Sequence, residues 1–285
     1  MMGLFSRKPA LAEGEVCPTG PESPETKRFF RKRSLAILGL IAGFLVINAI
    51  SGAFVGFDFV SALLEVPVGM GWMAVNFLPS AQSFEKLPQI MNALASTVLA
   101  SIASSTLAAV FAYISAVLGS RSVGVGRVAQ LLVRGIASLF RNIPVVAWAF
   151  ILLFSFRQSE FTGFLALFLG SYGYLTRCFL ETIDEVSGGT VEALRATGAS
   201  YLQIVTQAVI PLSITSVVSW MLYMVETNIR DATLVGILTG TGIGFVFNIF
   251  YKSFRYDTAG LAILCIVVVV IACEAISNYV RRRII

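Results

Sequence analysis

The chain has 285 residues, of which 56% are hydrophobic and only 13% are charged, and this composition excludes an ordinary soluble globular domain. The formal net charge of +5 is expected to reflect membrane topology and contact with lipid headgroups, so no nucleic-acid partner is expected. The absence of histidine excludes Ser-His-Asp and Cys-His catalysis and histidine-based zinc motifs.

Cofactor motifs are also missing from the sequence. A Walker A loop places glycine before lysine, and each of the five lysines follows another residue type. The sequence GTGIG at Gly240–Gly244 lacks the spacing and the preceding strand of a dinucleotide site. The four cysteines show no C-x-x-C spacing and are expected to fill apolar space. We therefore predict no cofactor, no metal and no enzymatic activity, with any energy supplied by a partner.

The N-terminal part of the chain is predicted to contain one membrane span. Residues 1–33 are rich in Lys and Arg and are expected to form a disordered cytoplasmic tail. An uncleaved first span, Ser34–Phe54, follows. The next stretch, Asp58–Ser80, is apolar but carries several prolines and glycines, so it is predicted to lie along the outer surface without crossing. Residues 34–88 thus combine a span with an interfacial segment.

Residues 89–285 are predicted to form the core membrane domain. An apolar helix of about 20 residues crosses the hydrocarbon core, and the further runs of this kind are Ile90–Leu118, Val128–Phe156, Phe161–Phe179, Ile210–Val225 and Leu261–Tyr279. The predicted fold class is an all-α integral membrane protein with six transmembrane helices.

The second run carries small residues at every fourth position. Two adjacent rows, from Ala93 to Ala109 and from Ser96 to Ala116, form one face without bulky side chains. Such a face lets another helix approach closely. Packing within one subunit is the favoured interpretation, and a transport pathway or a dimer interface is the alternative.

The third run is divided by Pro144. Arg141 and Asn142 come just before this proline in apolar surroundings. The proline removes a helix hydrogen bond, so the break could expose backbone groups to a pathway. A simple kink, with Arg141 reaching the cytoplasmic interface, fits the sequence equally well.

A polar stretch follows the fourth run. A helix is predicted to begin near Thr190, after Gly188 and Gly189, with Glu192 in its first turn. Gly198 then interrupts the helix or permits the close approach of another backbone. We predict a short cytoplasmic helix near residues 189–200 that another protein could hold.

A charged segment follows the fifth run. Glu226 and Arg230 stand four residues apart, with the acid first, which favours an ion pair on one helix. The alternative is a gate to a hydrated cavity on the outer side, where Arg230 or backbone amides meet an anion. Glycines from position 236 to position 244 favour irregular backbone there. The candidate pathway or gate residues are Glu226, Asn228, Arg230, Asp231, Thr233, Gly242 and Gly244.

The distribution of Lys and Arg predicts the orientation. With the N-terminus inside, the inner side collects 14 of these residues and the outer loops hold five. Because cytoplasmic loops retain Lys and Arg, both termini are expected in the cytoplasm.

Residues 192–211 resemble the EAA loop of ABC importer permeases. That pattern is E-A-A, three residues, G, nine residues, I, one residue and L-P, and Glu192, Ala193, Gly198 and Pro211 fall on it in register. Leu194, Ala208 and Ile210 depart from the pattern by mild apolar changes. The resemblance implies that the ATPase-coupling residues are Glu192, Ala193, Leu194, Gly198, Ala199 and Pro211.

Three blocks also resemble phosphonate-uptake permeases of the PhnE type. They are RNIPVVAWA from Arg141, EALRATGAS from Glu192 and ETNIRDATLVGILTGTGIG from Glu226. The similarity covers about residues 58–283. It implies a type I importer fold in the inner membrane, surrounded by membrane lipids. The implied partners are a second copy of this chain, two ABC ATPase subunits and a periplasmic or extracellular substrate-binding protein.

Other functions remain open at this point. The same architecture could carry phosphite, hypophosphite, phosphate or a compound such as methionine. An ion-coupled secondary transporter would need carboxylates within the membrane, and Glu274 is the clearest candidate. An intramembrane enzyme is the least favoured class, because the sequence shows no histidine and no evident carboxylate pair.

Overall fold

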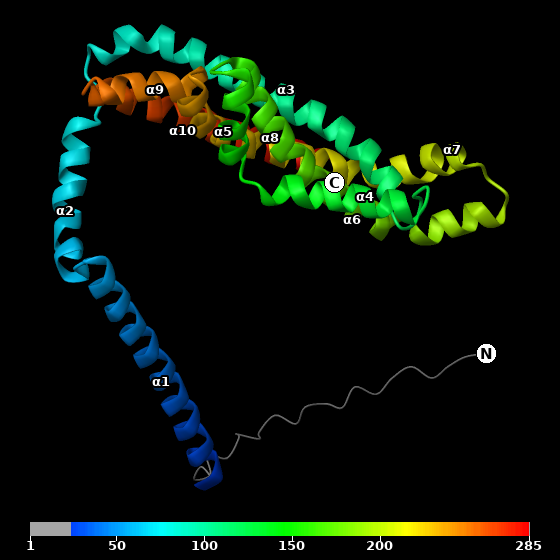
Figure 1. Ribbon diagram of the computed structural model, residues 1–285, viewed down its shortest axis with the longest axis horizontal. Coiled ribbons are helices and arrows are strands. Elements are labelled where there is room, and N and C mark those ends of the chain that lie inside the picture. Colours follow the sequence, from blue (N-terminus) through cyan, green and yellow to red (C-terminus); the bar gives the residue numbers. More distant parts are fainter. Residues whose placement is uncertain (1–23, 285) are drawn as a thin grey trace, which may run out of the picture. The chain divides into compact units, whose positions relative to one another are not determined.

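A computed structural model describes residues 24–284, and helices joined by short connections make up most of that range (Figure 1). The chain divides into two compact units, residues 1–71 and 72–285. The elements in chain order are α1 (Pro24–Val55), α2 (Phe59–Asn76), the 3-10 turn η1 (Ser83–Lys86), α3 (Leu87–Gly119), α4 (Arg127–Asn142), α5 (Val145–Phe156), α6 (Glu160–Ala196), α7 (Tyr201–Ile204), the π-helical turn η2 (Val205–Val209), α8 (Ile210–Thr239), α9 (Gly242–Lys252) and α10 (Tyr256–Ile284). The all-α prediction is confirmed.

Helix α1 begins earlier than the predicted span. Residues 24–33, which we assigned to a disordered tail, form its first turns, because the Lys and Arg residues there favour helix. Residues 30–55 are long and apolar enough to cross a membrane. The rest of the predicted tail, residues 1–23, lies outside the described residues.

Helix α2 covers most of the segment that was predicted to lie along the outer surface. It continues through Pro67, because in apolar surroundings the backbone must satisfy its hydrogen bonds within the helix. Its length and composition would allow it to cross a membrane. Asp58 precedes the helix, and the hydroxyl of Ser61 donates to its carboxylate at 2.7 Å, which lowers the pKa of Asp58 below its usual value.

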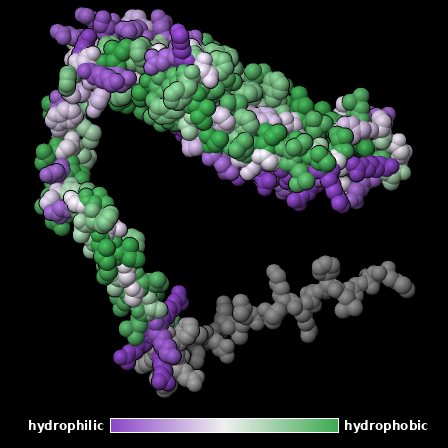
Figure 2. All heavy atoms as spheres, in the orientation of Figure 1, coloured by the Kyte–Doolittle hydropathy of each residue, from purple (hydrophilic) through white to green (hydrophobic). Residues whose placement is uncertain are grey.

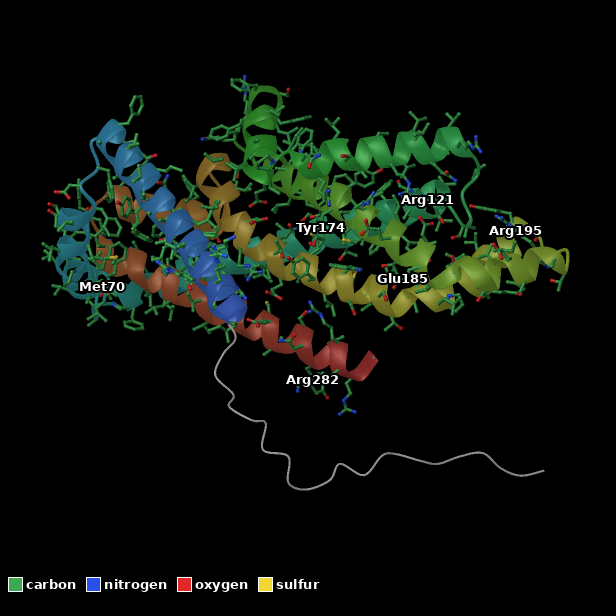
Figure 3. The ribbon with its side chains drawn as sticks, turned by 90° about the horizontal axis from the view of Figure 1, so that it is seen from below. Met70, Arg121, Tyr174, Glu185, Arg195 and Arg282 are labelled. Carbon is green, nitrogen blue, oxygen red and sulfur yellow. The ribbon has the colours of Figure 1, made fainter. Side chains whose placement is uncertain are left out.

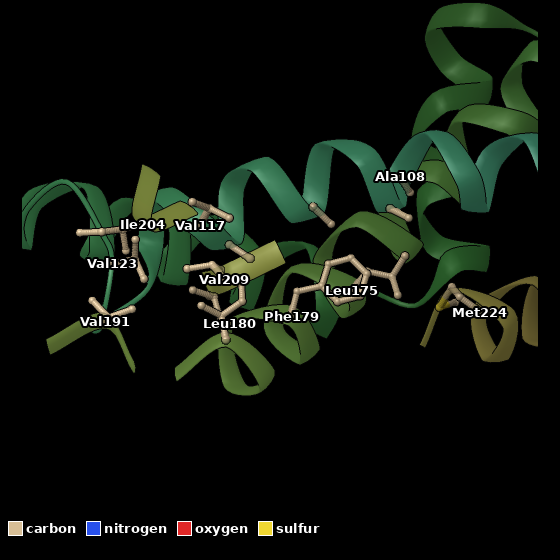
Figure 4. Close-up of a cluster of buried hydrophobic side chains, with 14 residues drawn as sticks. Ala108, Val117, Val123, Leu175, Phe179, Leu180, Val191, Ile204, Val209 and Met224 are labelled. Atoms are coloured by element: carbon tan, nitrogen blue, oxygen red, sulfur yellow. The ribbon is translucent and has the colours of Figure 1, made fainter. Parts of the chain in front are cut away.

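Helix α3 packs its small-residue face inside the larger unit. Ala108, Ala112 and Ala116 are fully buried, in one cluster with Leu175 and Phe179 of α6 (Figure 4). Side chains this small let the two helices approach closely and gain dispersion contacts. The predicted packing within one subunit is therefore confirmed.

The predicted third span is two helices and not one. α4 and α5 meet at an angle of 93°, because Ile143 is extended, as residues before proline usually are, and Pro144 caps α5. Two glycines of α6 leave the space that the bend occupies. A Cβ atom on Gly173 would lie 2.5 Å from the backbone nitrogen of Arg141, and one on Gly170 would lie 2.6 Å from Val145 Cγ2.

Helix α8 runs well past the predicted end of the fifth span, to Thr239. A turn at Gly240, with φ at 71°, then leads into α9. We name the two ends of the larger unit by their turns: the Gly198 end, where α6 meets α7, and the Gly240 end, where α8 meets α9. Hydrophilic residues gather toward both ends, and hydrophobic residues cover the middle (Figure 2).

Candidate functional site

The segment from Glu192 to Ser200 closes the long helix α6. The predicted separate helix starting at Thr190 is wrong, because α6 runs without interruption through Gly188 and Gly189 to Ala196. Neighbouring residues hold this part of α6 in place; Val191, for instance, is 1% exposed and belongs to the main hydrophobic cluster. Burial of this kind offsets the low helix propensity of the two glycines.

Gly198 ends α6 in a Schellman turn. Its φ is +80°, its N–H donates to the carbonyl of Arg195 at 3.0 Å, and the N–H of Ala199 donates to the carbonyl of Leu194 at 3.1 Å. These two bonds satisfy carbonyls that have no partner within the helix. Leu194 and Ala199 pack against the same hydrophobic cluster. Gly198 therefore interrupts the helix, one of the two roles predicted for it.

The outward face of this turn is exposed. Glu192, Ala193 and Gly198 are all exposed, and a Cβ atom on Gly198 would meet nothing within 4 Å. Leu202 follows at 70% exposed. A carboxylate, a small residue and one exposed leucine thus form the outer surface at this end of the larger unit. We call residues 192–202 the docking segment.

Pro211 explains the π-helical turn before α8. Proline lacks an N–H, and its ring clashes with the carbonyl four residues earlier. The chain widens to a π-helical turn, in which the N–H of Ile210 donates to the carbonyl of Val205. Ser213 bonds back to the carbonyl of Val209 at 2.6 Å. The result is an almost continuous helix, residues 201–239, that connects the docking segment to the span.

Asp184 of α6 is a site residue that sequence reasoning missed. Its Oδ1 accepts hydrogen bonds from Ser120 Oγ and from the backbone N–H of Arg121, both at 2.7 Å. Its Oδ2 pairs with Arg134 of α4 at 2.8 Å. An arginine inside an apolar run indicates a carboxylate partner, but the sequence does not say which one.

Asn228 is a buried connector among three helices. It is 0% exposed, and its Nδ2 donates to Ser105 of α3 at 2.8 Å and to Ser171 of α6 at 2.6 Å. Ser101 donates to its backbone carbonyl at 3.2 Å. These bonds satisfy the amide nitrogen, while Oδ1 of Asn228 has no hydrogen-bond partner among the described residues. The structure thus gives Asn228 a role in joining the three helices.

The charged residues around Asn228 differ in burial: Arg230 is exposed, whereas Glu226 and Asp231 are partly buried. Arg230 pairs with Glu226 at 3.1 Å, with side chains 50% and 13% exposed, so the favoured ion pair is present. Asp231 is half-buried, and the hydroxyl of Thr233 donates to the carbonyl of Ile229 at 3.4 Å. The structure thus brings the predicted polar residues of α8 onto several different faces.

The glycines at the Gly240 end have two separate roles. Gly240 and Gly242 have positive φ, so the predicted irregular backbone is confined to that turn. Gly236 and Gly244 are helical, and a Cβ atom on Gly244 would clash with the backbone carbonyl of Thr233. Gly244 therefore serves the contact between α8 and α9.

A cavity of about 560 Å³ lies beside this turn, between α3, α6 and α8. Small and polar side chains line much of it, with Gly236 and Gly242 among the lining residues. The only charged group in that lining is Glu160, which would repel an anion. Arg230 is not part of the lining, so the predicted meeting of an anion with Arg230 is not placed in this cavity.

The other predicted pathway residues lie at the bend between α4 and α5. Arg141, Asn142 and Pro144 are exposed, and the Asn142 amide donates to Ser138 Oγ at 3.3 Å. Among the described residues, no cluster of three or more metal-ligating side chains of the His, Cys, Asp and Glu types is found.

Two similar proteins are transport permeases by name. The chain is 25% identical over 196 residues to the phosphate-import permease protein PhnE of Mycolicibacterium smegmatis, covering 69% of this chain but only 37% of that relative. It is 28% identical over 187 residues to the phosphite transport system permease protein PtxC of Stutzerimonas stutzeri, covering 66% of this chain and 68% of that one.

The fold is also similar to a solved structure. The inward-facing MetNI methionine ABC transporter contains a chain with a TM-score of 0.58 and 19% identity, and the match covers 69% of this chain and 98% of that chain. This likeness concerns the fold alone and supports the type I importer architecture. Residues 108–285 match the family described as binding-protein-dependent transport system inner membrane component. More than half of the chain is matched, so it belongs to this family, and the predicted resemblance to PhnE-type permeases is confirmed.

Proposed function

We propose that this chain is the translocation subunit of an ABC importer for phosphonate or a related phosphorus oxyanion. The observation that best supports this proposal is the exposed docking segment. It continues directly into helices on both sides and lies within the residues that match the family. The names of the relatives PhnE and PtxC support the cargo class. The assembly would contain two copies of this chain, two ATPase subunits and a substrate-binding protein.

The coupling role follows from the geometry of the docking segment. An ATPase that grips Glu192, Ala193 and Leu202 would move the C-terminal end of α6 and the start of the α7–α8 helix together. Leu194 and Ala199 are packed on the hydrophobic cluster, so the turn cannot move without the helices beneath it. Displacement of the docking segment would therefore reach the membrane through α6 and α8.

The Gly198 end is proposed to face the cytoplasm. The C-terminal ends of α3 and α6 both lie at that end. There, Arg195 of α6 donates to the carbonyl of Ser122, which follows α3, at 3.0 Å. The bent pair α4–α5 must then return to the Gly240 end, where Gln158 bonds to Leu238. If α2 also crossed, the basic N-terminal tail would lie outside, against the usual retention of Lys and Arg in the cytoplasm. We therefore keep α2 in the outer interface.

The test is uptake by the assembled importer. The chain, purified from its host with its associated subunits, would be reconstituted in vesicles with ATP inside, and uptake of phosphite and methylphosphonate would be measured. ATP-dependent uptake of either compound is expected. Uptake that persists on a proton gradient without ATP hydrolysis would instead indicate a secondary transporter. A binding protein that ignores both compounds would contradict the cargo class.

Arg230→Ala should impair uptake more than membrane insertion, as a pathway role would require. The variant leaves Glu226, which is 13% exposed, without its partner, so a modest loss of stability of about 1 kcal/mol is also expected. The double variant Glu226→Gln with Arg230→Gln removes both charges and should recover insertion but not uptake. Uptake per inserted molecule is the quantity to compare. If uptake per inserted molecule stays at the parent level in both variants, the ion pair stabilises the protein and has no role in the pathway.

A further inference from the structure

Helix α6 has a weak point just before the docking segment. Gly188 and Gly189 stand side by side in its interior, and a Cβ atom on either would meet nothing within 4 Å. Packing therefore does not require glycine there, while glycine weakens a helix. The hydroxyl of Ser187 bonds back to the carbonyl of Ile183 at 2.6 Å, a contact that often bends helices.

The connection between α3 and α4 is attached to α6 on the near side of this weak point. Asp184, one turn before Gly188, accepts hydrogen bonds from Ser120 Oγ and from the N–H of Arg121, both at 2.7 Å. Bonds to an ionised carboxylate are among the stronger ones in proteins. The start of the connection is thus fastened to the part of α6 that belongs to the bundle.

The same connection is attached to α6 on the far side. Arg195 Nη2 donates to the carbonyl of Ser122 at 3.0 Å, and Val123 is buried in the same cluster as Val191 (Figure 4). Arg121 and Arg195 lie toward the same end of the unit (Figure 3). Residues 120–123 therefore contact α6 both before and after the glycine pair.

The connection is itself closed by internal hydrogen bonds. Ser120 Oγ accepts from the N–H of Val123 at 3.2 Å, and the carbonyl of Ser120 accepts from the N–H of Gly124 at 3.0 Å. Gln130 of α4 donates to the same carbonyl at 3.1 Å. Two hydrogen bonds within the connection and one from α4 therefore restrict its bending.

We propose that residues 120–123 act as a strut that braces α6 across Gly188 and Gly189, with Asp184 and Arg195 as the positioning residues at its two ends. The inference rests on the proposed function, because it assigns the strut to the transmission of movement from the docking segment. Without it, α6 would flex at the glycine pair, and the ATPase would move the segment without moving the bundle. Asp184 also pairs directly with Arg134, so a movement that the strut carries to this part of α6 reaches α4 as well.

The first measurement tests the bracing in this chain by itself. Spin labels on Ser138→Cys of α4 and Ala196→Cys of α6, in a background with the four native cysteines replaced by alanine, would report one distance in lipid nanodiscs. Both positions are exposed. Asp184→Asn and Arg195→Met should each broaden the distance distribution. Arg134→Met removes the ion pair but leaves the strut bonds, so it should broaden the distribution least.

The second measurement is a rescue. In the assembled importer, Asp184→Asn and Arg195→Met should lower solute transported per ATP by about fivefold, the factor that corresponds to about 1 kcal/mol, with ATPase association retained. Adding Gly188→Ala and Gly189→Ala stiffens α6 directly and should restore both the narrow distribution and the ratio.

Two results would overturn the strut. The first is a distance distribution like that of the parent in both Asp184→Asn and Arg195→Met. The second is a loss of solute transported per ATP that Gly188→Ala with Gly189→Ala does not restore. A variant that fails to fold would be recognised by its elution profile, and Ser120→Ala, which removes one bond to Asp184, then takes its place. Failure of the unmodified chain to bind any ATPase would contradict the proposed function, while the distance measurement would still decide the strut.

Discussion

Gly244→Ala should strongly reduce the amount of folded protein. The added methyl group would clash with the backbone carbonyl of Thr233 and lie 2.9 Å from the backbone nitrogen of Ile237. Backbone atoms cannot move aside as a side-chain end can, so α9 must separate from α8. Overpacking of this kind costs about 1–3 kcal/mol, and more where backbone is involved. Thermal unfolding in detergent, followed by tryptophan fluorescence, measures the loss.

The matched control for this prediction is Gly135→Ala in α4. A Cβ atom there would meet nothing within 4 Å, and alanine is the better helix former, so the unfolding temperature should stay the same or rise. The contrast isolates the close contact from the general effect of alanine. If Gly244→Ala unfolds like the parent but abolishes uptake, the pathway role predicted from the sequence is favoured over packing.

Gly198→Val should uncouple the docking segment. The residue has a φ of +80°, a left-handed conformation that costs an ordinary side chain about 1–2 kcal/mol and a β-branched one more. The Schellman turn would open, and Leu194 and Ala199 would lose their positions on the hydrophobic cluster. We expect weaker association with the ATPase and a large loss of uptake, measured by co-elution and by vesicle transport.

Gly198→Asn separates the two possible reasons for a glycine at this position. Asparagine tolerates left-handed backbone, and the space around the position is open within this chain. Association should therefore survive in this variant. An asparagine variant as damaged as the valine variant would show that the ATPase approaches Gly198 too closely for any side chain, and that backbone conformation is not the reason.

Features with a local cause could be predicted from the sequence. Five of the apolar runs predicted the long apolar helices α1, α3, α6, α8 and α10, because a helix must be long and apolar to cross a membrane. The small-residue rows predicted the packed face of α3. Gly198 predicted an interruption of the helix as one of two alternatives, and the left-handed backbone at this position is one that favours glycine.

Features with a tertiary cause could not be predicted in the same way. Gly188 and Gly189 suggested a helix start, yet burial of neighbours such as Val191 keeps α6 continuous. Pro144 indicated a kink, but the bend of 93° depends on the close contact of this segment with Gly170 and Gly173 of α6. Asp184 gave no signal, since its partners lie 50 or more positions away in the sequence.

The buried amide of Asn228 restricts how the subunit can change shape. Its two bonds and the one from Ser101 join α3, α6 and α8 where Asn228 is fully buried, and each of these groups left without a partner would cost about 1–3 kcal/mol. Sliding α8 would break all three bonds, sliding α3 would break two, and sliding α6 would break the one to Ser171. The least costly large motion within this chain leaves the three helices in fixed register and changes the bend beside Pro144.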